Sequence, residues 1–289
     1  MIRDGHLTQR ELLADESMHR ALESRAHALL KATTFAACYA ARNLLDPLVR
    51  FEEVAILAYH SISDAPVETA VAPAEFDRQL RALAARGYRF VPLASVAAWV
   101  AGRETIPRKA VAITFDDGYA DFETAALPIL ERHGVSSTLF TVGDAAGSRE
   151  ALRNDIPLLS AEALARVRAR PLVEIGYHSR THTNLAALRG DALARETAAA
   201  SPARFFAYPG GKHSRQAAEA LRQAGYDAAC TIRPVLAHRG GDPYSLPRSV
   251  VLGGMPLWQV MAHASRAADW HRALRNTMRR SMSVGGSQR

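Results

Sequence analysis

The sequence predicts an α/β fold with about seven parallel strands and helices between them. Short apolar runs of strand length recur after residue 53, and most are followed by a segment of helical composition. Strands separated by helices of about 10–15 residues are typical of right-handed βαβ units, which form a parallel sheet. Several of the apolar runs end in Asp or His, and parallel strands bring their carboxyl ends to one edge. About seven strands in one sheet favour a barrel-like closure.

The residues before this alternation are expected to form an N-terminal helical extension, residues 1–50. Residues 16–45 contain neither Pro nor Gly and place apolar side chains among charged ones, as helices do. Residues 51–272 carry the alternation and are interpreted as one domain. Residues 273–289 contain Arg without balancing acids and end in a Gly- and Ser-rich stretch, so they are interpreted as a basic, disordered tail.

Turn and capping residues divide the domain into its expected elements. The predicted helix at 160–170 starts with a cap-like Ser, and Gly134 and Gly225 end two other helices. The predicted strands cover residues 54–60, 88–92, 111–115, 137–142, 172–177, 204–208 and 226–232. The predicted helices cover residues 73–86, 94–101, 119–133, 160–170, 191–200 and 214–224.

Charge and composition indicate a globular protein without a nucleic-acid partner. The 289 residues are 48% hydrophobic and 22% charged, and the net charge is +7. The basic residues are scattered along the chain instead of forming a block, which is typical of a solvated surface. The N-terminus lacks the apolar core of a signal peptide, and residues 32–49 are too interrupted by polar side chains to span a bilayer. We therefore expect a cytoplasmic or membrane-peripheral location, and the oligomeric state stays open.

Four side chains at two strand ends form a candidate metal site. The third predicted strand ends in Asp116 and Asp117, and two adjacent carboxylates repel each other unless a cation lies near them. The fifth predicted strand ends in His178, and His182 follows four residues later. One carboxylate and two imidazoles suit a divalent ion and leave positions for water and substrate, as catalytic zinc requires. We expect zinc at Asp117, His178 and His182, with cobalt and nickel as alternatives.

The remaining carboxylate, Asp116, is expected to act as a base. Successive side chains of an extended backbone point in opposite directions, so Asp116 cannot easily bind the same ion as Asp117. A metal ion lowers the pKa of a bound water towards about 7, and a neighbouring carboxylate can accept its proton during attack on a carbonyl. The pattern therefore indicates hydrolysis assisted by a divalent metal ion.

Three sequence motifs resemble those of the polysaccharide deacetylases, carbohydrate esterase family 4. They are Thr-Phe-Asp-Asp-Gly at 114–118, His-Ser-Arg-Thr-His at 178–182 and Phe-Ala-Tyr-Pro-Gly-Gly at 206–211. The motifs follow in the family's order, and the similarity covers about residues 52–252.

The resemblance implies an irregular (β/α) barrel and assigns roles to individual residues. Asp116 is the base in that pattern, and Asp117, His178 and His182 bind the metal ion. The resemblance further implies that the backbone N–H of Tyr208 helps to hold the oxyanion.

The chain departs from the family's pattern at two places. The third motif usually contains an Arg that orients the base, and Ala207 stands there instead. The usual C-terminal Leu-x-His element, which supplies the general acid, is absent. The Phe-Ala-Tyr-Pro variant resembles a circularly permuted branch that acts on poly-N-acetylglucosamine, so His60, before the first motif, is the expected acid. Arg248 is a candidate for the missing cation, and Arg248 and Pro209 are the expected substrate-binding residues.

Together these expectations describe a metal-dependent hydrolase that removes N-acetyl groups from amino sugars of a bacterial polysaccharide or its precursor. Its partner is then an N-acetylated poly- or oligosaccharide. The alternatives on the same scaffold are an O-deacetylase and a deformylase that acts on a lipid-linked or surface sugar. A two-histidine, one-carboxylate iron oxygenase is disfavoured because such sites usually place the acid close to the first His in sequence. The complete ligand set disfavours a carbohydrate-binding relic without catalysis.

Overall fold

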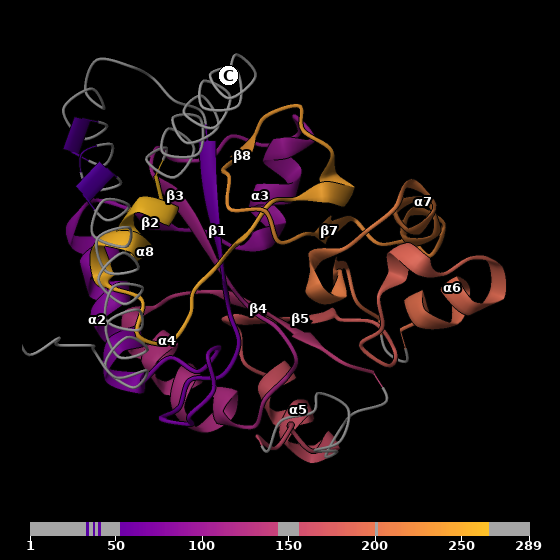
Figure 1. The fold of residues 1–289 in the computed structure, drawn as a ribbon, viewed down its shortest axis with the longest axis horizontal. Helices are drawn as coiled ribbons and strands as arrows, with labels where there is room; N and C mark the ends of the chain where they lie inside the picture. The colour runs from indigo at the N-terminus through magenta and orange to yellow at the C-terminus, as the bar shows by residue number, and fades with distance from the viewer. Residues whose placement is uncertain are drawn as a thin grey trace, which may run out of the picture.

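The computed structural model is an α/β fold with a strongly curved sheet surrounded by helices (Figure 1). It describes residues 33, 34, 37, 40, 41, 53–143, 156–199 and 202–265. The predicted fold class, an irregular (β/α) barrel, is confirmed by the order and direction of the strands. The expected N-terminal extension lies outside the described residues apart from five positions between 33 and 41, which are helical. The expected tail at 273–289 lies outside them altogether.

One sheet contains every strand of the described residues. Its main path runs β7-β6-β5-β4-β3-β1-β8, while β2 pairs with β3 and β9 pairs with β1. All pairs are parallel except that of β1 with β8. The strands are β1 (Glu53–Tyr59), β2 (Arg89–Phe90), β3 (Ala110–Phe115), β4 (Ser137–Thr141), β5 (Val173–Tyr177), β6 (Phe205–Ala207), β7 (Ala228–Cys230), β8 (Ala237–His238) and β9 (Ser249–Val250).

A short segment, residues 246–250, connects the two ends of the parallel sheet. The Leu246 N–H donates to the carbonyl of Ala229 in β7, and the N–H of Thr231 donates back to the carbonyl of Leu246. Three residues further on, Ser249 pairs with Leu57 of β1. The segment therefore fills the gap between β7 and β1, and its middle residue, Arg248, lies inside the barrel with no exposed surface.

The alternation of side chains along the strands assigns them to the inside or the outside of the barrel. In β3, Ala110 and Ala112 belong to the same buried cluster as inner residues of β4, β6 and β7. Val111 and Ile113 belong to the cluster formed with the outer helices. Since the period of a strand is two residues, Asp116 continues the inner series of β3.

Helices surround the sheet and cover its outer face (Figure 1). Ser160 and Ser214 cap two of them, because each hydroxyl accepts a hydrogen bond from the N–H three residues later. The predicted helix at 119–133 begins later, with a π-helical turn at Phe122–Ala126. The α-helices are α2 (Pro73–Ala85), α3 (Leu93–Val100), α4 (Leu127–His133), α5 (Ala161–Arg168), α6 (Gly190–Thr197), α7 (Arg215–Gln223) and α8 (Leu257–His263). The 3-10 turns are η2 (Leu185–Ala187), η3 (Pro209–Gly211) and η4 (Pro243–Ser245).

Within the described part of the chain, no helix combines the length and the apolar character that a membrane crossing requires.

Candidate active site

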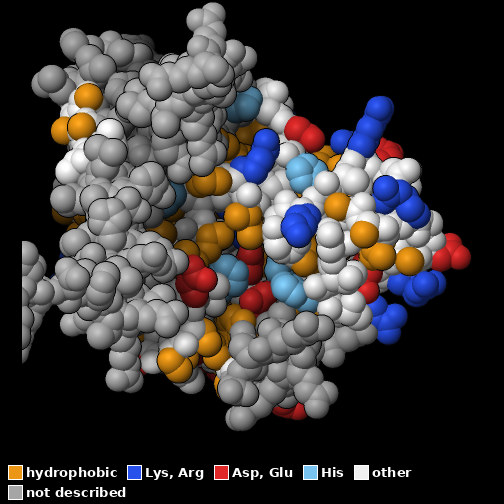
Figure 2. Space-filling view, viewed as in Figure 1, with side chains coloured by type: hydrophobic (Ala, Val, Ile, Leu, Met, Phe, Trp, Pro, Cys, Tyr) orange, Lys and Arg blue, Asp and Glu red, His pale blue; other side chains and the backbone are white. Residues whose placement is uncertain are grey.

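The candidate residues gather where the parallel strands end. Asp116 and Asp117 follow β3, His178 follows β5, and His60 follows β1. Figure 2 shows a hollow near the centre of one face, where acidic and histidine side chains lie next to each other and basic side chains stand beside it. The candidate active site therefore lies at the carboxyl edge of the sheet.

Asp117, His178 and His182 form the group of described residues that could hold a metal ion. Their ligand atoms all lie within 4.8 Å of one another. The Nε2 atoms of both histidines lie 3.4 Å from Oδ1 of Asp117. That Oδ1 is buried and has no hydrogen-bond partner within the described residues, which is costly for a carboxylate oxygen. A divalent cation among these three atoms would remove this cost, so the residues fit a metal ion.

His178 is oriented by the strand next to its own. Its Nδ1 lies 2.7 Å from the carbonyl oxygen of Ala207, the last residue of β6. Because a carbonyl only accepts, Nδ1 carries the proton and Nε2 is free to bind a cation. Burial, the largest influence, lowers the pKa of His178, and it outweighs the opposing charges of Asp116 and Asp117. The imidazole is thus held in the neutral form that metal ions bind.

The backbone is strained at the same place. Four described residues other than glycine have positive φ, and three of them lie in the metal-site loops: Asp117 at 76°, Ser179 at 64° and His182 at 57°. The left-handed conformation costs free energy for residues with a Cβ. Such strain persists only where the surrounding structure enforces it, and it is common at functional sites.

Asp116 forms a buried ion pair with Arg248. The two guanidinium nitrogens lie 2.6 and 2.7 Å from the two carboxylate oxygens, so the pair is bidentate. Arg248 also donates to Thr114 Oγ1 at 3.1 Å and to the carbonyl of Thr231 at 3.3 Å. Its guanidinium carbon lies 5.2 Å from the ring centre of Phe140. The cation missing at Ala207 is therefore supplied by the closing segment, residues 246–250.

The ion pair controls the protonation of Asp116. Burial is the largest single influence and would raise the pKa of this carboxyl, but the charge of Arg248 and its hydrogen bonds to the carboxylate work in the opposite direction and lower it. The net result is a pKa well below the usual range of an aspartate. Asp116 is accordingly a carboxylate at neutral pH, as a proton acceptor must be.

His60 lies beside Asp116 because their strands are in register. Tyr59 pairs with Phe115 across β1 and β3, so His60 and Asp116 occupy the next positions. The Asp116 N–H donates to the carbonyl of Tyr59 at 2.9 Å. The Nδ1 of His60 is buried and finds no hydrogen-bond partner in the described part of the chain. The residue as a whole is only partly buried, so a substrate would reach His60 through the exposed part of its side chain.

Asp121 is a site residue that the sequence analysis missed. Its carboxylate accepts hydrogen bonds from Ser61 Oγ at 2.5 Å and from the Ile62 N–H at 3.0 Å. These contacts tie the chain that follows His60 to the loop that carries both aspartates. The one signal in the sequence is its position four residues after Asp117, and that spacing alone does not reveal a contact with residue 61.

The structure differs from the expectations for Tyr208 and Pro209. The Tyr208 N–H donates to the carbonyl of Cys230 at 3.0 Å, so the pairing of β6 with β7 occupies this amide. The phenol ring packs outward with α6 and α7, and its hydroxyl donates to Tyr244 O. Pro209 is buried at the start of η3. Neither residue is available to an oxyanion or a sugar in this arrangement, and Arg248, which is fully buried, can reach substrate only through Asp116.

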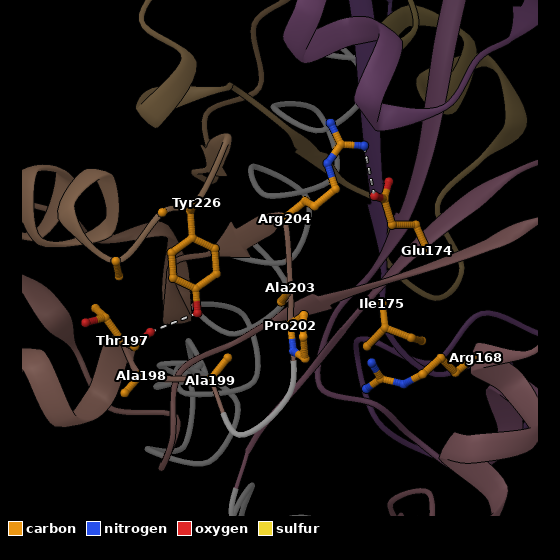
Figure 3. A pocket seen from close by; sticks show the side chains of 12 residues that line it. Arg168, Glu174, Ile175, Thr197, Ala198, Ala199, Pro202, Ala203, Arg204 and Tyr226 are labelled. Carbon is orange, nitrogen blue, oxygen red and sulfur yellow. Dashed lines mark hydrogen bonds and ion pairs between the residues drawn. The ribbon is translucent and has the colours of Figure 1, made fainter.

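A second hollow, of about 930 Å³, lies at the amino ends of β5, β6 and β7 (Figure 3). Arg204 lies 3.8 Å from Glu174 on its wall, and Tyr226 donates to the carbonyl of Thr197. None of the candidate catalytic or metal-binding residues lines it. It is at the opposite edge of the sheet from the metal ligands, so it is separate from the candidate active site.

The chain is similar in sequence and fold to known polysaccharide deacetylases. The sequence pattern of the family described as polysaccharide deacetylase matches residues 103–229, which include all three motifs but neither His60 nor Arg248. The protein YxkH of Bacillus subtilis (strain 168), itself named a putative polysaccharide deacetylase, is 27% identical over 209 residues, or 69% of this chain and 72% of YxkH. The structure of IcaB from Ammonifex degensii has a TM-score of 0.63 and 25% identity and covers 74% of this chain and 97% of IcaB. The Streptococcus pyogenes deacetylase PplD, solved with acetate, has the same TM-score at 21% identity and covers 74% of this chain and 98% of PplD.

Proposed function

We propose, on the premise of its similarity in sequence and fold to polysaccharide deacetylases, that the chain is a metal-dependent hydrolase that removes N-acetyl groups from an amino-sugar polymer. One observation carries this proposal. A buried carboxylate held by an Arg lies next to an Asp, His, His set that fits a divalent ion. A base and a neighbouring metal site are the two parts that hydrolysis of an acyl group needs.

Asp117, His178 and His182 would hold the ion. When bound, a divalent ion such as zinc supplies a Lewis acid and lowers the pKa of water. Asp116 accepts the proton of the water that adds to the acyl carbon, and Arg248 keeps its carboxylate ionised and aimed. His60 donates a proton to the leaving nitrogen as the C–N bond breaks, which releases acetate and a free amine.

An acid beside the base, the role that we propose for His60, favours an amide over an ester. An amine leaves an acyl carbon only after its nitrogen has gained a proton, whereas an alkoxide depends less on such help. We expect His60, which is partly exposed and follows the strand next to that of Asp116, to give that proton. The resemblance of the third motif to the poly-N-acetylglucosamine branch supports the same substrate class.

The proposed reaction is tested by acetate release. The purified full chain, loaded with zinc, is incubated with chitooligosaccharides and with poly-N-acetylglucosamine, and acetate is measured by an enzyme-coupled assay. We expect acetate from at least one N-acetylated substrate, loss of activity with a chelator and recovery with zinc or cobalt. Acetate from O-acetylated sugars alone, or formate from N-formyl sugars alone, would contradict N-deacetylation and favour the other two acyl substrates.

Replacement of His60 by alanine should lower kcat on N-acetylated sugars by about 100- to 10,000-fold, the usual contribution of a general acid. The loss should be much smaller on 4-nitrophenyl acetate, because nitrophenolate leaves without a proton. Both rates are measured on the zinc-loaded protein. The ratio of the two losses reports the role of His60 as an acid, which a purely structural role would not change.

His238→Ala is the matched control for this experiment. His238 is exposed on β8, which pairs with the amino end of β1 and not with its carboxyl end. Its removal should leave both rates close to those of the unmodified chain. Equal losses of His60→Ala on both substrates would show that His60 is not the acid.

A further inference from the structure

The loop between β5 and η2 carries His182, the candidate ligand that is farthest in sequence from the end of its strand. Its backbone turns through positive φ at Ser179 and again at His182. His182 is 30% exposed in its side chain, whereas His178 is 2% exposed. His178 is fixed by its own strand and by the carbonyl of Ala207. The position of His182 must come from contacts of the loop itself.

Glu196 supplies those contacts from the neighbouring helix α6. Its Oε2 accepts the Thr181 N–H at 3.0 Å, and its Oε1 accepts the Thr181 hydroxyl at 2.7 Å. Its backbone carbonyl also accepts the N–H of Arg180 at 3.1 Å. Three hydrogen bonds from one residue therefore reach the two residues that precede His182.

An acidic side chain at position 196 does not stabilise helix α6. Glu196 is the penultimate residue of α6, and a carboxylate in the last turn faces the negative end of the helix dipole. Glu196 is also only 9% exposed, and burial of a carboxylate is unfavourable unless its oxygens accept hydrogen bonds. The two hydrogen bonds from Thr181 explain why position 196 carries a glutamate, although a glutamate there does not favour the helix.

We propose that Glu196 is a positioning residue that holds Thr181 and thereby fixes His182 among the metal ligands. The inference rests on the proposed metal site, not on the identity of the substrate. Glu196 acts as a hydrogen-bond acceptor from outside the ligand set, since its carboxylate binds the loop and not the ion. Residues of this kind orient ligands and tune metal affinity.

The test compares zinc affinity, measured by competition with a chromophoric chelator, in variants of the full chain. Glu196→Leu removes both acceptors and should weaken zinc binding by about 10- to 100-fold, the usual effect of losing an outer contact to a ligand. Thr181→Val, at an exposed position, removes one bond and should weaken binding less. Glu196→Gln should stay close to the unmodified chain, because the amide can accept the N–H while the Thr181 hydroxyl accepts from its NH₂. The visible spectrum of the cobalt-loaded protein should change in Glu196→Leu if His182 no longer binds in the same way.

Glu219→Leu is the control, because Glu219 is exposed on α7 and pairs with Arg222. Its zinc affinity should equal that of the unmodified chain. The proposal is overturned if Thr181→Val and every folded Glu196 variant bind zinc within about twofold of the unmodified chain, or if Glu219→Leu weakens binding as much as Glu196→Leu. An unmodified chain that binds no metal overturns both the metal site and this role. Zinc binding without acetate release would contradict only the proposed reaction.

Discussion

Replacement of Arg248 by methionine should lower the free energy of unfolding by about 3–5 kcal/mol at neutral pH, because removal of one partner leaves a buried charge without compensation. Arg248 is 0% exposed and Asp116 is 1% exposed, so water cannot replace the lost partner. Methionine keeps the length of the side chain and removes its charge. Urea unfolding of both proteins at neutral pH gives the difference directly.

The pH dependence of this difference has a defined sign. In the unmodified chain the pKa of Asp116 is below that of an unfolded aspartate, so its pairing contributes stability above about pH 4 that is lost as the pH falls further. Without Arg248, burial would dominate and raise the pKa of Asp116, so the variant gains stability from protonation as the pH falls. The difference in the free energy of unfolding between the two proteins should therefore be largest at neutral pH and decrease towards about pH 4.

The same substitution should lower deacetylase activity by about 100-fold, since a base misplaced by about 1 Å loses that much. The acid limb of the pH–rate profile should also move to higher pH, because the carboxylate of Asp116 then protonates more easily. A second change, Asp116→Asn on the Arg248→Met background, removes the unpaired charge and should restore part of the stability without restoring activity. An Arg248→Met protein as stable and active as the unmodified chain would contradict the coupling of these two residues.

The regular part of the fold could be predicted because its apolar periodicity is strong. β3, with six buried residues, and α7, with one buried face, stand where the sequence places a strand and a helix. β8 and β9 have two residues each, and such short pieces carry no periodicity. The closing segment 246–250 contains Pro247 and a buried Arg, so nothing in its local sequence indicates that it joins β7 to β1.

The site residues that follow strand ends could be predicted from the sequence. Those that depend on how the segment 246–250 closes the barrel could not. Asp117 and His178 each follow a recognisable strand, which places both at one edge of the sheet. The contact of Arg248 with Asp116 spans 132 positions and exists because the closing segment enters the barrel. The oxyanion role expected for Tyr208 requires that its backbone N–H is free. The pairing of β6 with β7 continues one residue past β6, so this N–H donates to the carbonyl of Cys230 instead. The register at a strand end is a property of tertiary structure, and no motif encodes it.

Asp116→Asn should leave metal affinity nearly unchanged and Asp117→Asn should lower it strongly, although both should lower activity. Asp116→Asn should lower kcat by about 100- to 10,000-fold, because an amide accepts no proton from water, and yet leave zinc affinity within a few-fold. Asp117→Asn should weaken zinc binding by more than about 100-fold, since loss of a ligand costs more than loss of an outer contact. Zinc affinity and acetate release are measured on the same preparations.

The folding of the two variants needs separate control, because the Asp116→Asn change leaves Arg248 with a weaker partner. The Oδ1 of an asparagine side chain still accepts one of the two guanidinium hydrogen bonds, so we expect a folded protein of lower stability. Thermal unfolding of the metal-free variants sets the temperature at which both are assayed. Equal loss of zinc affinity in the two variants would mean that both carboxylates bind the ion. Their separation instead follows from the backbone: Asp116 continues the inner series of β3 towards Arg248, while the positive φ of Asp117 turns its carboxylate to the two histidines.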